Sequence, residues 1–182
     1  SITRLIAGAN LDRAAAGKPA YGSKLLYYQL LEVHVGLDPE RFVADLAAEG
    51  VQFVHARRAT FHQALSLSVA QTTHQYTRLR GQTVTQTQVR LDIPGFLRQL
   101  RWNAALLAWE ETLLRPYGPV TVDYEADLED ADRQQATVDR LCAAIGAPSG
   151  PVAAPTRRIL GADQGRAVAN FEEALAAAAA EG

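Results

Sequence analysis

A chain of 182 residues that is 48% hydrophobic can bury one sizeable core, so we expect a single domain over 1–182. The 18 basic and 20 acidic residues give a net charge of −2, too balanced to hold a nucleic-acid backbone, and no apolar stretch approaches the roughly 20 residues of a membrane span. With Cys142 as the only cysteine and no apolar signal-peptide core near the N-terminus, we expect a cytoplasmic protein without intrachain disulfides.

Helical and strand patterns alternate in the first part of the chain. Asp38, Pro39 and Glu40 supply an N-cap, a first-turn proline and a first-turn acid, which together predict the start of a helix. Short β-prone runs lie on either side of it. The predicted elements, in order, are a helix over 1–16, a strand over 21–28, a helix over 38–50, a strand over 51–56 and a helix over 60–76.

The second part of the chain continues the alternation after a polar stretch, Thr77–Leu91, which reads as a long loop. The predicted elements after it are a helix over 94–115, a strand over 119–124, a helix over 132–145, a linker over 149–155 and an alanine-rich helix from about 166. Strands alternating with helices indicate an α/β fold of three layers, with a short parallel sheet flanked by helices.

In a parallel sheet, ligands bind beyond the carboxyl ends of the strands, where the next helix begins. Arg58 follows the strand predicted over 51–56, and Ser66 lies eight residues later, two turns into the following helix. A guanidinium and a hydroxyl so placed can converge on one phosphate group. Taken alone, an arginine and a serine at this spacing are more often a chance pairing than a site.

The sequence around these two residues resembles that of the sulfotransferase family, most closely the bacterial trehalose 2-sulfotransferase type. The family's 3′-phosphate motif is a strand ending in arginine and a serine in a helix containing Gln-Ala-x-Ser, here Arg58 and Gln63–Ser66. Tyr21–Leu25 is similar to the Gly-x-Lys strand before that motif. Val120–Leu128 and the helix ending at Pro148 are similar to later segments, so the likeness covers about 20–148.

The resemblance implies a P-loop-like sulfotransferase fold and transfer of a sulfuryl group from 3′-phosphoadenosine 5′-phosphosulfate (PAPS) to a hydroxyl of a carbohydrate or small metabolite, leaving 3′-phosphoadenosine 5′-phosphate (PAP). It assigns Arg58 and Ser66 to the 3′-phosphate, and it adds Arg157 and Arg158 as a late basic segment near the nucleotide, although two exposed arginines are the commoner reading. No metal is implied. The loop Thr77–Leu91 is the expected contact for the acceptor, on position alone.

The chain departs from the family at its start. The loop that holds the 5′-phosphosulfate, Pro-x-x-Gly-Ser/Thr, has no counterpart between Ser1 and Pro19, so we expect an N-terminal segment to be missing. Where other sulfotransferases place a catalytic histidine, two residues after the strand lysine, this chain has Leu26. No catalytic residue is assigned.

For the other candidate residues we predict structural roles. We expect His55 and His62 to be structural, and Glu125 to cap a helix or to pair with an arginine. Trp102 and Trp109, seven residues apart, fit a core or a partner interface better than a sugar platform. The alternative function is therefore a non-catalytic binding or assembly protein of the same fold, and in either case a homodimer is a reasonable expectation.

Overall fold

A computed structural model describes residues 22–34, 36–76, 78–79, 88–153, 156–157 and 167–181, so the helix expected over 1–16 lies outside the described residues. The chain divides into two compact units. The strand-pair unit contains the described residues of 22–57 and 106–152, and the helical unit contains those of 58–105 and 153–181. The two units are described separately below, and the single domain expected from length stays a prediction.

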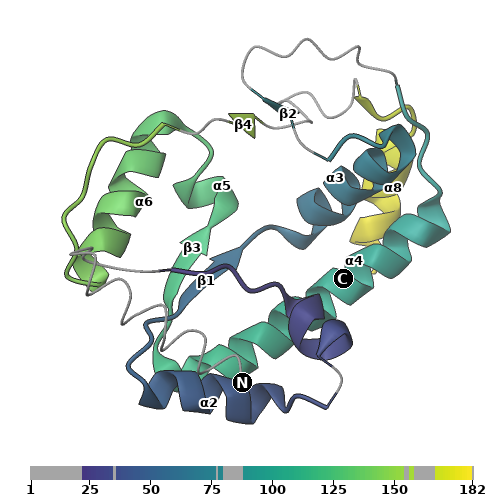
Figure 1. The fold of residues 1–182 in the computed structure, drawn as a ribbon. Helices are drawn as coiled ribbons and strands as arrows, with labels where there is room; N and C mark the ends of the chain where they lie inside the picture. Colours follow the sequence, from purple (N-terminus) through teal and green to yellow (C-terminus); the bar gives the residue numbers. More distant parts are fainter. Residues whose placement is uncertain are drawn as a thin grey trace. The chain divides into compact units, whose positions relative to one another are not determined.

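The strand-pair unit contains a short parallel sheet of two strands, β1 (Val54–Arg57) and β3 (Val120–Asp123), drawn side by side in Figure 1. The register places Arg57 opposite Asp123. The coarse α/β prediction is therefore confirmed, although β1 begins later than the strand predicted over 51–56. The backbone N–H of Val51 donates to the carbonyl of Leu46 at 3.1 Å, so the residues before β1 still belong to the end of the preceding helix.

The strand predicted over 21–28 is wrong. Residues 22–26 have no regular structure, and a helical turn at 27–28 leads into η1 (Gln29–Val33). The side chain of Gln29 accepts a hydrogen bond from the backbone N–H of Leu26 at 2.8 Å, and the N–H of Gln29 donates to the Leu26 carbonyl at 2.9 Å. These local bonds satisfy the backbone within the turn. The aromatic, β-prone residues from which the strand was predicted therefore form no strand here.

The helices of the strand-pair unit begin at the expected caps. Asp38 accepts hydrogen bonds from the N–H groups of Glu40 and Arg41 at the start of α2 (Pro39–Ala48), which confirms the helix predicted there. The other helices of the unit are η2 (Arg115–Tyr117), α5 (Tyr124–Asp127), α6 (Ala131–Ala144) and the residues from 106 onward of α4 (Ile93–Leu114). Its core is formed by Leu30, Phe42, Val43 and Leu46 packed against side chains that include Phe53, Trp109 and Leu113.

The helical unit contains α3 (Thr60–Thr73), the first part of α4 and α8 (Phe171–Ala179), together with the two-residue antiparallel strands β2 (Arg78–Leu79) and β4 (Thr156–Arg157). Phe96 of α4 is 1% exposed and Leu65 of α3 is fully buried at the centre of its core. The ring of Phe61 contacts the rings of Phe96 and Phe171 edge to face. The long helices predicted over 60–76 and 94–115 are confirmed, with ends that differ by at most three residues.

Two segments far apart in the sequence are joined next to this core. Val89 forms an isolated parallel bridge with Val168, and the buried side chain of Asn170 accepts from the N–H of Leu91 at 2.9 Å and donates to its carbonyl at 3.2 Å. Because residues 167–170 make these contacts, α8 begins at Phe171 and not near 166. Of the predicted loop Thr77–Leu91, the structure describes residues 78–79, which form β2, and 88–91, while 77 and 80–87 lie outside the described residues.

Candidate phosphate site

The helical unit brings Arg58 and Ser66 together. Arg58 directly follows β1 in the chain, and Ser66 lies in the second turn of α3. One terminal nitrogen of the Arg58 guanidinium, Nη2, donates to Ser66 Oγ at 3.0 Å, and both residues are half-buried. The two side chains therefore lie on the same side of the backbone, as the spacing predicted.

This pair has the chemistry of an anion site. A guanidinium offers several N–H donors in a fixed fork, and a serine hydroxyl can donate one more hydrogen bond. Because Arg58 and Ser66 already reach one another at 3.0 Å, both can reach neighbouring oxygens of a single phosphate. The positive end of the α3 dipole, at the same end of the helix, favours the same charge.

For the second pair of predicted site residues, the structure describes only the backbone of Arg157. The backbone of Arg157 lies in β4, opposite Arg78 in β2. Arg158 lies outside the described residues. The nucleotide contact expected of both residues stays a prediction.

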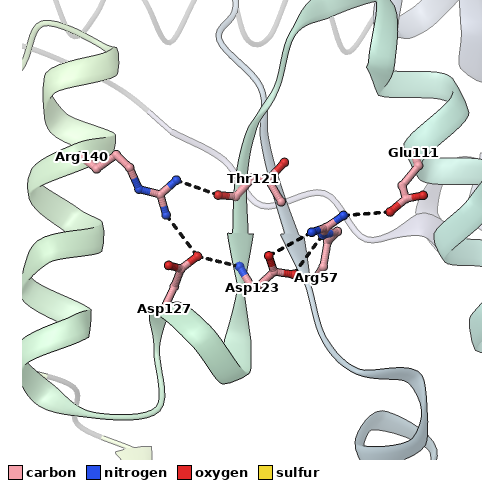
Figure 2. Close-up of polar contacts among 6 residues, drawn as sticks. All are labelled: Arg57, Glu111, Thr121, Asp123, Asp127 and Arg140. Atoms are coloured by element: carbon pink, nitrogen blue, oxygen red, sulfur yellow. Dashed lines mark hydrogen bonds and ion pairs between the residues drawn. The ribbon is translucent and has the colours of Figure 1, made fainter.

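Arg57, the neighbour of Arg58 in the chain, has a different role in the strand-pair unit (Figure 2). Its guanidinium donates to both carboxylate oxygens of Asp123, at 3.0 and 2.9 Å, and to Glu111 at 2.9 Å. The hydrogen bonds from Arg57 hold the pKa of the Asp123 carboxyl below its ordinary value, and Asp123 raises the pKa of Arg57. Arg57 thus joins β1, β3 and α4 and is a structural ion pair.

A second group of polar contacts secures the end of β3 (Figure 2). Asp127 Oδ2 accepts from the backbone N–H of Asp123 at 2.8 Å and from Arg140 at 3.1 Å. Arg140 also donates to the carbonyl of Thr121 at 2.9 Å. Asp127 thus bonds to the backbone at the start of α5, and the cap or arginine pair expected of Glu125 stays a prediction.

The sequence did not reveal these two polar groups, because they depend on pairing across the sheet. The pairing of Arg57 with Asp123 follows from the register of β1 against β3, and the run Arg57-Arg58 does not say which arginine faces the neighbouring strand. A weak signal was available in Val120–Asp123, since a strand that ends in an acid next to a strand that ends in an arginine favours such a pair.

The remaining candidate residues are described by their contacts and exposure. His55 is 6% exposed, and its Nε2 lies 3.1 Å from Glu110 Oε2. The His62 ring contacts the Phe61 ring edge to face. Trp109 packs against the core of the strand-pair unit, whereas Trp102 belongs to the helical unit and is 49% exposed. The core role expected for the tryptophans therefore holds for Trp109.

The described residues contain no group of three histidine, cysteine or acidic side chains placed to hold a metal ion. None of the described helices is both long and apolar enough to cross a membrane. No family model, curated protein or solved structure matches this chain.

Proposed function

We propose that this chain binds the 3′-phosphate of PAPS through Arg58 and Ser66 and serves the transfer of a sulfuryl group to a hydroxyl of a carbohydrate or small metabolite. The observation that carries the proposal is the 3.0 Å hydrogen bond between Arg58 Nη2 and Ser66 Oγ. It supports the proposal because an arginine at a strand end and a serine two helical turns onward are the pair by which the chain resembles sulfotransferases. The P-loop-like fold belongs to the same proposal.

In such a transfer, the acceptor oxygen bonds to sulfur while the bond between sulfur and the 5′-phosphate oxygen breaks, so PAP departs and the acceptor loses a proton. Arg58 and Ser66 would contribute by anchoring the donor at its 3′-phosphate, which fixes the direction of the reacting bond. Charge on the departing nucleotide is stabilised by donors of this type. The described residues assign no base for the acceptor proton.

Calorimetric titration of the whole chain with PAP tests the proposal. We expect micromolar binding that Arg58→Ala weakens by about tenfold to a hundredfold, since a hydrogen bond to a charged group contributes about 1.5–3 kcal/mol. Ser66→Ala removes one neutral donor and has the smaller effect. Arg41→Ala is the matched control, because Arg41 is an exposed arginine on α2 and its loss should leave binding unchanged.

The alternative function gives the opposite pattern. A chain that does not bind PAP but forms a stable dimer in sedimentation would be a binding or assembly protein. Binding of PAP that survives Arg58→Ala unchanged would remove Arg58 from the site and contradict the assignment.

A further inference from the structure

The helical unit carries an open groove between α3 and the beginning of α4. Its volume is about 710 Å³, within the range of small-molecule sites. The floor is apolar, formed by the buried side chains of Leu91 and Phe96. The rim is polar apart from one aromatic ring, with Gln71 and Thr72 on α3 facing Asp92, Arg98 and Trp102.

Trp102 is the feature of the groove that folding does not explain. It is 49% exposed, although it lies on the same helix as Phe96, which is in the core of the helical unit, and Leu100, which packs against that core. A large indole face left beside amide, hydroxyl, carboxylate and guanidinium groups matches a ligand that is apolar on one face and rich in hydroxyls at its edge. A pyranose sugar has this character, because its axial C–H groups form an apolar face and its equatorial hydroxyls lie around the ring.

The polar rim is held in position before any ligand arrives. Asp92 Oδ2 accepts from the backbone N–H of Gly95 at 3.1 Å, which fixes the carboxylate at the start of α4. A Cβ atom on Gly95 would lie 2.5 Å from that oxygen, so the carboxylate can occupy this place only because residue 95 is glycine. Gln99, also in the groove, donates to the buried Asn103 at 2.8 Å. Prepositioned side chains of this kind lower the entropy cost of binding.

The groove is separate from the phosphate site. Ser68, which lines it, lies two residues after Ser66, and two residues along an α-helix correspond to a rotation of about 200°. The groove and Ser66 are therefore on opposite faces of α3.

We propose that this groove is a carbohydrate-binding site in which the Trp102 ring stacks on a pyranose face while Asp92 and Gln99 bond to its hydroxyls. The site would take a neutral glucose-type unit of a small saccharide or polysaccharide. The inference does not rest on sulfuryl transfer, since every residue that carries it belongs to the groove.

The two tryptophans of the chain allow a direct test, because each can be left as the single emitter. In Trp109→Phe the fluorescence reports on Trp102 alone, and we expect a saturable change with cellobiose or maltose at a Kd on the order of 1 mM. In Trp102→Phe the remaining Trp109, packed against the core of the strand-pair unit, should show no change.

Two further variants separate binding from folding, with sugar binding followed by saturation-transfer NMR. Trp102→Ala should weaken binding about tenfold or more while the circular dichroism spectrum is retained, because the ring is exposed. Asp92→Asn keeps a residue that caps helices equally well but removes the charge, so it should weaken binding severalfold without loss of stability. Arg90→Ala, a variant of an exposed arginine outside the groove, should bind as the unmodified chain does.

The absence of a saturable response to either sugar would overturn the proposal. So would a dimer that dissociates in Trp102→Ala, because the ring would then be covered by a second copy of the chain. PAP binding should be the same in Trp102→Ala and in the unmodified chain, so failure of this site and failure of the phosphate site are distinguishable.

Discussion

Two neighbouring arginines show how differently the two units of this protein use charge. Arg57, in the strand-pair unit, is held by both oxygens of Asp123 and by Glu111. Arg58, in the helical unit, donates to the hydroxyl of Ser66. A guanidinium matched by two carboxylates is part of a structural ion pair, whereas the hydrogen bond between Arg58 and Ser66 places a hydroxyl beside a guanidinium, and both groups can bond to a phosphate.

The same contrast extends to the surroundings of each arginine. In the strand-pair unit, the polar groups at the end of the sheet bond to one another through Asp123, Asp127 and Arg140. In the helical unit, Asp92, Arg98 and Trp102 line an open groove, with Asp92 and Arg98 4.0 Å apart. The polar groups at the end of the sheet thus bond to one another, whereas in the helical unit polar side chains also line a groove.

The largest expected effect on stability comes from removing a large side chain of the core beneath the groove. Phe96 is 1% exposed and contacts Phe61 edge to face, so Phe96→Ala should lower the free energy of unfolding by about 3–5 kcal/mol. Urea denaturation followed by circular dichroism measures this change. A loss below about 1 kcal/mol would mean that the helical unit does not depend on this core, since even a single deleted methylene is felt in a packed interior.

Next in size is the connection between Leu91 and Asn170. Asn170→Ala removes two hydrogen bonds from a buried backbone, and we expect a loss of about 1–3 kcal/mol in the free energy of unfolding. Asn170→Asp keeps the acceptor for the Leu91 N–H but loses the donor to its carbonyl, so its effect should be intermediate if the protein remains folded. Equal stability of Asn170→Ala and the unmodified chain would contradict the role assigned to this side chain.

The ion pair of the strand-pair unit should have a smaller, pH-dependent effect. Arg57 lowers the pKa of Asp123, so the stabilisation is complete above the unfolded pKa of the carboxyl and is lost as the pH falls through its lower folded value. Because the pair is partly exposed and screened by solvent, Asp123→Asn should lower the free energy of unfolding at neutral pH by only about 1 kcal/mol.

The difference in the free energy of unfolding between Asp123→Asn and the unmodified chain should become smaller below about pH 4, where an unpaired carboxyl is protonated. Thermal unfolding of both proteins at several pH values measures this difference in stability. Asp45→Asn, a variant of an exposed acid on α2, is the control and should show no comparable pH dependence. A constant difference from neutral to acidic pH would show that the charge of Asp123 is not what stabilises the sheet.

The smallest effect concerns the surface of α6. The Ser149 hydroxyl donates to Asp139 and lowers the pKa of that carboxyl, with a lesser contribution from Gln135. Ser149→Ala should therefore raise the pKa of Asp139 in an NMR titration. An unchanged pKa would mean that the segment after α6 does not rest on this helix in solution.

The sequence predicted the helices well because their signals are local. Asp38 and Pro39 mark the start of α2, and the long apolar periods of α3 and α4 need no knowledge of their neighbours. The spacing of Arg58 and Ser66 is also local, since both side chains follow from one strand end and one helix.

Features that depend on distant partners were missed. The strand expected over 21–28 is absent because Gln29 satisfies the backbone of Leu26. The Arg57–Asp123 pair requires the strand register, and the groove beside Trp102 requires the packing of α3 against α4. The cytoplasmic location, the homodimer and the acceptor role of Thr77–Leu91 stay predictions.

The most direct test of the phosphate site compares two ligands on the unmodified chain. PAP and 5′-AMP differ only in the 3′-phosphate, so the ratio of their dissociation constants isolates the contribution of that group. If Arg58 and Ser66 hold the 3′-phosphate, PAP should bind about tenfold or more tightly than 5′-AMP, and the preference should disappear in Arg58→Ala. Equal affinity for the two nucleotides in the unmodified chain would contradict the proposed site.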